Sequence, residues 1–276
     1  PNGLSMEIAP GALKAGKRVV DLSGDFRLPP EVYEAWYRIP HKSPDLYREA
    51  VYGLPELHRE ELKGARLVAN PGCYVTAATL ALAPLAAEGV LKGAFGGGLS
   101  GVWGAGREAE GTAFAEVNEN LKPYKAGGTH RHIPEMERNL GRILAQGRRV
   151  RTHGEARAVR LSFTPHLVPM TRGILVTAEA EVEGAWSQES LEALYRDFYA
   201  GEPFVRVLKG LPETKATLGS NRVDVRPLYE ERTGRVLVFA ALDNLVKGMA
   251  GQAVQNLNLM LGLPEETALP KEGLWP

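Results

Sequence analysis

The chain has 276 residues, which fits about two domains, and 44% of them are apolar, enough to form a buried core. Its 33 basic residues balance 33 acidic ones, which argues against attachment to nucleic acid or anionic lipid by charge. Short apolar runs, a single cysteine and no secretory signal at the start predict a soluble cytoplasmic protein whose partner is a small molecule or another subunit.

Helix and strand patterns alternate over the first seventy residues, which is typical of an α/β fold. Three of these segments read as helices because apolar residues recur at helical spacing or because a proline stands where a first turn begins. Two short apolar runs read as buried strands. The expected helices are 5–16, 30–36 and 56–63, and the expected strands are 19–22 and 66–69.

The turn Asn70-Pro71-Gly72 delivers the lone Cys73 to the start of a helix that we expect to run to about residue 87. A thiol at a helix start faces unpaired amides and the positive end of the dipole, which lower its pKa toward a reactive thiolate. Cys73 is therefore the first candidate nucleophile. The competing interpretation is a small buried apolar side chain, which is the more common role of a lone cysteine.

The glycine-dense segment 93–111 fits no helix or strand pattern. Residues 96–101 spell G-x-G-x-x-G, but the glycines that follow spoil the helix that a dinucleotide-binding turn requires. We therefore expect a glycine-rich turn where the backbone approaches a ligand or a neighbouring chain. Arg107 follows this segment and could clamp a carboxylate or phosphate group, although most arginines are surface charges.

Two histidines, His130 and His132, precede a helix-like segment and could supply a base for the thiol. In an extended backbone they would point to opposite sides, so we expect only one to face Cys73. A solvated loop is the alternative. No metal site is predicted, because the chain has no second cysteine and the other histidines lie at no metal-ligand spacing.

The second half of the chain reads as strands with two helices. Alternation of apolar and polar residues marks the strands, and Ser187 can cap a helix. Asn244 stands before the last helix, where its amide could grip a nicotinamide carboxamide. The expected strands are 159–163, 173–182, 224–229 and 236–241, the last two forming a hairpin, and the final helix is 247–261.

Five motifs, in this order, give the chain a family resemblance. They are 20–27 (VDLSGDFR), 51–57 (VYGLPEL), 69–74 (ANPGCY), 128–135 (GTHRHIPE) and 243–256 (DNLVKGMAGQAVQN). Together they resemble the N-acetyl-gamma-glutamyl-phosphate reductase family of the aspartate-semialdehyde dehydrogenase superfamily. The resemblance implies NADPH-dependent reduction of N-acetyl-glutamyl 5-phosphate to the 5-semialdehyde and inorganic phosphate, through a cysteine thioester, in arginine biosynthesis.

The resemblance also implies roles for individual residues. Cys73 would be the nucleophile and His132 the acid/base, with His130 in reserve. Asn70 and Arg107 would bind the substrate. The residues expected to bind NADP(H) are Ser23, Ser100, Gly101, Gly104 and Asn244.

The implied architecture is a partial Rossmann-type nucleotide-binding domain and an α/β catalytic and dimerisation domain with a largely antiparallel or mixed sheet. We expect the first domain to comprise 1–72 and 245–276 and the second 73–244. The family's opening strand, phosphate turn and helix have no counterpart before Pro1, so we expect the first part of the nucleotide-binding domain to be missing. A homodimer or homotetramer is expected.

Three alternatives stay open on the sequence alone. The substrate could be an aminoadipyl phosphate of carrier-linked lysine biosynthesis or aspartyl phosphate, although the turn ANPGCY favours the glutamyl compound. The same cysteine and histidine could serve a hydrolase or acyl transferase that uses no hydride. The chain could also be a catalytically silent subunit, because part of the cofactor site is expected to be missing.

Overall fold

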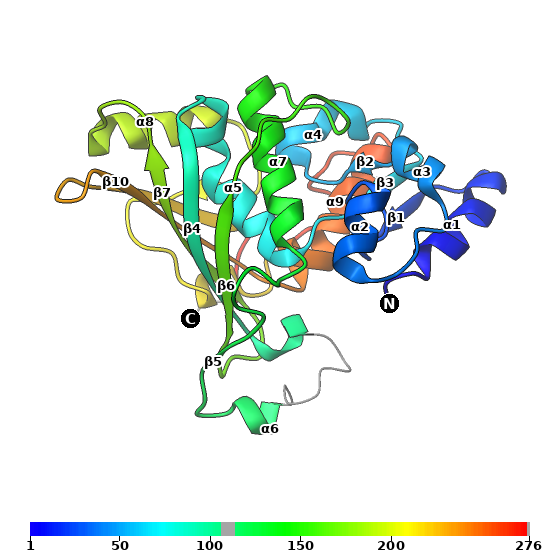
Figure 1. The fold of residues 1–276 in the computed structure, drawn as a ribbon, viewed down its shortest axis with the longest axis horizontal. Helices are drawn as coiled ribbons and strands as arrows, with labels where there is room; N and C mark the ends of the chain where they lie inside the picture. The colour runs from blue at the N-terminus through cyan, green and yellow to red at the C-terminus, as the bar shows by residue number, and fades with distance from the viewer. Residues whose placement is uncertain (106–113, 275–276) are drawn as a thin grey trace.

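The computed structural model describes residues 1–105 and 114–274, which build two sheets flanked by helices (Figure 1). The first part of the chain and its last helix form the smaller region. Its elements are α1 (Ser5–Lys14), β1 (Val19–Asp21), α2 (Pro30–Tyr37), α3 (Pro44–Glu49), β2 (Val51–Tyr52), α4 (Pro55–Leu62), β3 (Leu67–Ala69) and α9 (Gly251–Met260).

The smaller region is held together by a sheet of three parallel strands in the order β1-β3-β2. All three residues of β3 are buried, as expected of a central parallel strand covered on both faces. Helix α9 returns from the end of the chain and packs Leu259 and Met260 against Leu62 and Val68. The expected helix and strand alternation of this region is confirmed.

The larger region contains a seven-stranded mixed sheet. Its elements are α5 (Cys73–Ala87), β4 (Leu91–Ser100), a 3-10 turn η1 (Val102–Ala105), α6 (Phe114–Val117), β5 (Lys122–Pro123), α7 (Ile133–Gln146), β6 (Leu161–Leu167), β7 (Ile174–Val182), α8 (Gln188–Phe198), β8 (Val205–Val207), a second 3-10 turn η2 (Lys215–Thr217), β9 (Val223–Glu230) and β10 (Arg235–Leu242). The strand order is β5-β6-β4-β7-β10-β9-β8. Most neighbouring pairs are antiparallel, and the pairs β4·β6 and β8·β9 are parallel.

Helices cover one face of the large sheet. Helix α5 lies against the sheet with α7 beside it and α8 at the far end (Figure 1). Residues 74–86 of α5 are buried all round, which suits their alanine- and leucine-rich composition. The strand residues that point away from α5 include the exposed Phe95 and the half-buried Leu237 and Phe239. This outer face has no covering element among the described residues.

Residues 93–100 of the glycine-dense segment lie in strand β4, which corrects the expectation of a turn over this part. Strand β4 pairs with β7 and β6 through Gly96, Gly97 and Gly98. At Gly98 an added Cβ would lie 2.4 Å from the ring of Tyr74, so only glycine lets α5 pack this closely. The sequence pattern did not predict this strand, because glycine has a low strand propensity.

The other expected elements of the larger region are confirmed, with shifted ends. Ser187 caps α8 in a capping box with Ser190. Strand β6 runs on through Pro165, whereas the sequence pattern ended at residue 163. The final helix begins with a π-helical turn, η3 (Val246–Ala250), before α9. No helix in residues 1–105 or 114–274 is long and apolar enough to span a membrane.

Candidate active site

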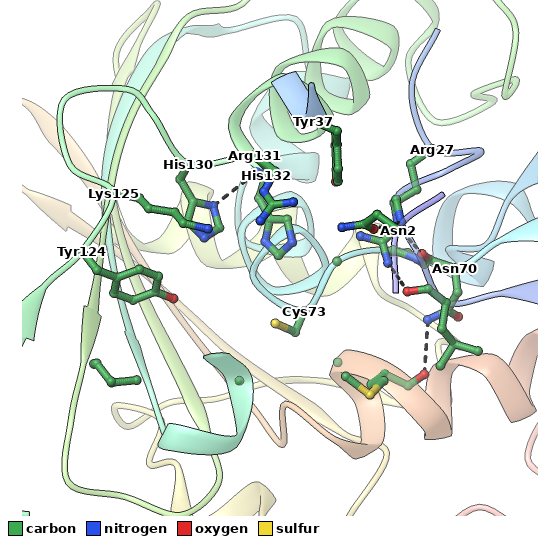
Figure 2. Close-up of a pocket in the computed structure, with 18 of the residues that line it drawn as sticks. Asn2, Arg27, Tyr37, Asn70, Cys73, Tyr124, Lys125, His130, Arg131 and His132 are labelled. Atoms are coloured by element: carbon green, nitrogen blue, oxygen red, sulfur yellow. Dashed lines mark hydrogen bonds between the residues drawn. The ribbon is translucent and has the colours of Figure 1, made fainter. Parts of the chain in front are cut away.

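A cavity of 530 Å³ lies between the two regions and contains Cys73. Residues from the end of the small sheet form one side, and residues from the loop before α7 and the loops of the large sheet form the other (Figure 2). The turn from β3 to α5 lies at the boundary. The carboxyl ends of parallel strands are the usual position of ligand sites in α/β folds.

Cys73 is the first residue of α5 and is half-buried at the cavity wall. The residue before it, Gly72, has an extended backbone, and the π-helical turn brings Gly248 so close that an added Cβ would lie 2.8 Å from Cys73 Cβ. Burial raises the pKa of the thiol to about 11, although the Tyr74 amide and Arg27 act to lower it. The expectation of a lowered pKa is therefore wrong for the ligand-free protein, because desolvation outweighs the helix start.

Both histidines line the cavity that contains Cys73. His132 has a helical backbone conformation instead of an extended one, and its ring centroid lies 4.7 Å from that of His130. Figure 2 shows the two imidazoles beside each other with Cys73 below them. His132 lies against the turn, since a Cβ on Gly72 would come within 2.5 Å of its Nε2. The nucleophile candidate and the acid/base candidate are thus neighbours.

The electrostatics of the cavity favour neutral imidazoles. Burial and the charges of Lys125 and Arg131 lower the pKa of His130 to about 4. Burial, His130 and Arg27 also hold the pKa of His132 well below its usual value. Near neutral pH a neutral thiol therefore faces neutral rings. A neutral imidazole can accept the proton of a thiol, which is the property that a general base needs.

Arg27 lines the cavity, and the sequence reasoning gave it no role. Its Nε donates to the Asn70 carbonyl at 2.7 Å and its Nη2 to the Leu22 carbonyl at 2.7 Å. Its Nη1 lies 3.6 Å from the buried Glu135 carboxylate. Both residues stand in quoted motifs, and a charged residue shortly after a buried strand was the signal that could have identified Arg27.

Lys125 and Arg131 add positive charge to the cavity wall and were also missed. The backbone of Lys125 has φ 46°, a conformation that non-glycine residues rarely adopt and that often occurs at functional sites. Arg131 lies over the ring of Tyr37, with its Cζ 5.1 Å from the ring centroid. These cations suit an anionic substrate.

Four of the five residues expected to bind the cofactor lie together on the large-sheet side. Gly104 lines the cavity, and an added Cβ there would lie 2.4 Å from Ser100 Oγ and 3.4 Å from Asn244 Nδ2. Asn244 Oδ1 accepts a hydrogen bond from the Gly173 amide at 2.7 Å, whereas its buried Nδ2 has no hydrogen-bond partner in the described protein. Gly101 follows Ser100 and its amide bonds the Gly173 carbonyl. A buried donor without a partner is what a carboxamide ligand would satisfy.

Ser23 is separate from this group. It lies at the end of β1 in another hollow, where its hydroxyl bonds Asp21 at 3.0 Å. Asn70 does line the cavity, but its amide already bonds the Met249 carbonyl and Asn256. The substrate candidate Arg107 lies outside the described residues.

Two family models match the chain. The model described as semialdehyde dehydrogenase, NAD binding domain, matches residues 1–65. The model described as semialdehyde dehydrogenase, dimerisation domain, matches residues 73–244. The second match begins at Cys73, so the turn that leads to the cysteine lies between the two matched regions.

Curated relatives extend this likeness over the whole chain. N-acetyl-gamma-glutamyl-phosphate reductase of Thermus thermophilus is 99% identical over 276 residues, which are 100% of this chain and 80% of the relative. The protein of the same name from Symbiobacterium thermophilum is 53% identical over 99% of this chain and 77% of its own length.

Solved structures share the fold at low sequence identity. Aspartate semialdehyde dehydrogenase II of Vibrio cholerae superposes with a TM-score of 0.70 at 18% identity, covering 94% of this chain and 77% of that one. The Candida albicans aspartate semialdehyde dehydrogenase solved with NADP gives a TM-score of 0.64 at 15% identity, covering 94% and 74%. At these identities the likeness concerns the fold alone.

Proposed function

The chain belongs to the N-acetyl-gamma-glutamyl-phosphate reductase family of semialdehyde dehydrogenases, and we propose that it performs this family's reaction through a thioester on Cys73. The reaction reduces N-acetyl-glutamyl 5-phosphate to the 5-semialdehyde and inorganic phosphate, with NADPH as reductant. The observation that carries the proposal is a cavity in which the only cysteine meets two neutral imidazoles under a cationic wall.

In the proposed first step His132 accepts the proton of the neutral Cys73 thiol while the sulfur attacks the acyl carbon. A C–S bond forms, the C–O bond to the phosphoryl group breaks, and the proton leaves with the phosphate. Close packing of Gly72 against His132 supports this assignment, because it keeps the ring beside the residue that carries the sulfur. His130 is held in reserve for the same role, since its ring lines the same cavity.

The start of α5 can stabilise the negative charge that develops on the acyl oxygen. Amides at the first turn of a helix have no partner within the helix and point toward the ligand. The Arg27 guanidinium adds a positive charge that acts on the sulfur, as the lowering of the Cys73 pKa by Arg27 indicates. Both groups are fixed before the substrate arrives, which favours the tetrahedral intermediate.

The residues around Gly104 fit a nicotinamide. We propose that Asn244 offers its unpaired Nδ2 to the carboxamide, with Ser100, Gly101 and Gly104 forming the surrounding wall. NADPH, when bound, supplies the hydride that reduces the thioester carbon. The C–S bond then breaks, the aldehyde leaves, and His132, which takes up a proton from solvent after the phosphate has left, gives that proton to the sulfur. The overall reaction consumes one proton, which restores the Cys73 thiol.

We keep Ser23 as a cofactor contact and Asn70 and Arg107 as substrate contacts, each as part of the proposal. We also keep the division of the chain into a nucleotide-binding part, 1–72 with 245–276, and a catalytic part, 73–244. The packing of α9 against the small sheet supports this division.

We further propose that two copies associate through the open face of the large sheet. Phe95 is 59% exposed there, on the same face as the half-buried Leu237 and Phe239 two strands away. A face with large apolar side chains and no covering helix is typical of an interface between subunits. Because a free thiol must stay reduced for this chemistry, we place the reaction in the cytoplasm.

The test is the variant Cys73→Ser, assayed by nicotinamide absorbance with N-acetyl-glutamyl 5-phosphate. We expect turnover to fall by at least about 1000-fold, because a serine hydroxyl is a far weaker nucleophile beside a neutral imidazole. The control is Ser187→Ala, which alters the cap of α8 and no cavity residue. Near-normal turnover by Cys73→Ser would contradict the proposal, as would ester cleavage by the parent protein without any change in nicotinamide absorbance.

A further inference from the structure

A buried carboxylate lies behind the nucleophile. Glu135 has 0% exposure and is the third residue of α7, the helix that starts directly after His132. Its Oε1 accepts hydrogen bonds from the Gly72 amide at 3.2 Å and from the Tyr52 hydroxyl at 2.7 Å. The Gly72 amide belongs to the residue immediately before Cys73. The Glu135 side chain, on the helix that follows His132, is therefore hydrogen-bonded to the turn that precedes Cys73.

The second oxygen of the same carboxylate faces the cavity cation. Glu135 Oε2 lies 3.6 Å from Arg27 Nη1 and has no hydrogen bond among the described residues. Arg27 is itself buried, and its Nε and Nη2 bond neutral carbonyl groups. A buried guanidinium needs an anion nearby to be stable in its charged form. Glu135 is the carboxylate that supplies this charge.

The turn at Gly72 is held from two sides by the start of α7. On one side the Glu135 carboxylate accepts its N–H. On the other side its Cα packs so tightly against the His132 ring that there is no room for a Cβ. Both contacts come from residues three apart in sequence, on one turn of helix. A displacement of Glu135 would therefore move Cys73 relative to His132.

We propose that Glu135 is a positioning residue for the reductase reaction, fixing the Gly72–Cys73 peptide against the His132 imidazole and holding Arg27 in the cavity wall. It does not line the cavity and acts only through these groups. The inference rests on the proposed function, because it takes Cys73 as the nucleophile.

The negative charge of Glu135 affects the pKa of the Cys73 thiol, which a purely structural role would leave unchanged. Arg27 acts to lower the pKa of the Cys73 thiol and Glu135 acts to raise it, so the two charges oppose each other at the sulfur. Removing the carboxylate charge should therefore stabilise the thiolate and lower the pKa of the thiol. The other titratable or charged groups of the cavity remain in place: Tyr37, Lys122, Tyr124, Lys125, His130, Arg131 and His132.

Two variants separate position from charge. For Glu135→Ala, which removes both acceptor oxygens, we expect kcat to fall about 100-fold, the effect of a misplacement of about 1 Å. The KM for NADPH should stay near the parent value, since Glu135 does not contact the residues proposed to bind the nicotinamide. Glu135→Gln keeps an oxygen for Gly72 and Tyr52, so it should recover much of kcat while the pH profile of Cys73 alkylation by iodoacetamide moves to lower pH.

The matched control is Glu137→Gln on the same helix, where the carboxylate accepts the Leu161 amide at 2.9 Å and no other hydrogen bond from the residues that the structure describes. We expect it to resemble the parent in both kcat and alkylation. The inference is overturned if Glu135→Ala keeps kcat within about threefold of the parent, or if the alkylation profile of Glu135→Gln does not move. If Glu135→Ala does not fold, the test rests on Glu135→Gln: a shift of its alkylation profile to lower pH supports the inference, and an unchanged profile overturns it. Turnover by Cys73→Ser would instead overturn the proposed function, whatever the Glu135 variants do.

Discussion

The small parallel sheet and the large mixed sheet contribute to the cavity in opposite ways. At the end of the small sheet the polar groups near the nucleophile are engaged: Arg27 bonds two carbonyl groups, and the Asn70 amide bonds both Met249 and Asn256. At the end of the large sheet the Asn244 Nδ2 is buried without a partner in the described protein. The contacts on the small-sheet side hold the turn before Cys73 in place. The large-sheet side leaves the Asn244 Nδ2 as a donor for a ligand.

The two sheets also differ in how their faces are used. Strand β3 is buried on both faces, whereas β7 alternates buried and partly exposed residues along its length. The large sheet therefore retains an open face that the small sheet lacks. The small-sheet side thus engages the polar groups around the sulfur, whereas the large sheet leaves an unpartnered donor and an open face, which we propose for a cofactor and a second subunit.

Among the variants that test this comparison, the largest expected effect comes from disturbing the turn at Gly72. Gly72→Ala would place a Cβ 2.5 Å from His132 Nε2, so either the ring or the turn must move. We expect kcat to fall about 100-fold with a small change in the melting temperature. Gly11→Ala is the control, because an added Cβ on that helical glycine meets nothing within 4 Å. Parent-like turnover by Gly72→Ala would show that the turn is less constrained than these contacts indicate.

A smaller effect measures the burial of the sulfur itself. With a thiol pKa of about 11, the native protein should react with iodoacetamide at pH 8 about tenfold more slowly than the urea-unfolded chain, and its rate should keep rising toward pH 11. The sign follows from burial, which favours the neutral thiol, so the native state holds its proton to higher pH and loses stability as pH rises from about 9 to 11. A native rate that levels off below pH 9 is the contrary result.

The smallest effect on chemistry is expected at the open face. Phe95→Glu places a charge on the outer surface of β4 and should convert an assembled form into a smaller species in sedimentation experiments. Leu211→Glu is the control, because Leu211 is 60% exposed and lies in no strand. An unchanged sedimentation coefficient for Phe95→Glu, beside an assembled parent, would place the interface elsewhere.

Much of the fold could be predicted from local pattern. The helix that begins at Cys73, the cap at Ser187 and the hairpin of β9 and β10 all depend on residues close in sequence. Strand β4 could not be predicted this way, because its glycines are explained by Tyr74, which packs against Gly98 from another element. The extended backbone expected at His132 was wrong, because a helix starts directly after this residue and gives it a helical conformation.

The sequence by itself determined the type of chemistry: a single thiol at a helix start, a histidine pair and the family's motifs. Only the tertiary structure decided the protonation state of that thiol and the partners of Arg27 and Glu135. The physical reason is that a helix start acts on the sulfur through neighbouring amides, whereas desolvation and buried charges come from elements far apart in the chain.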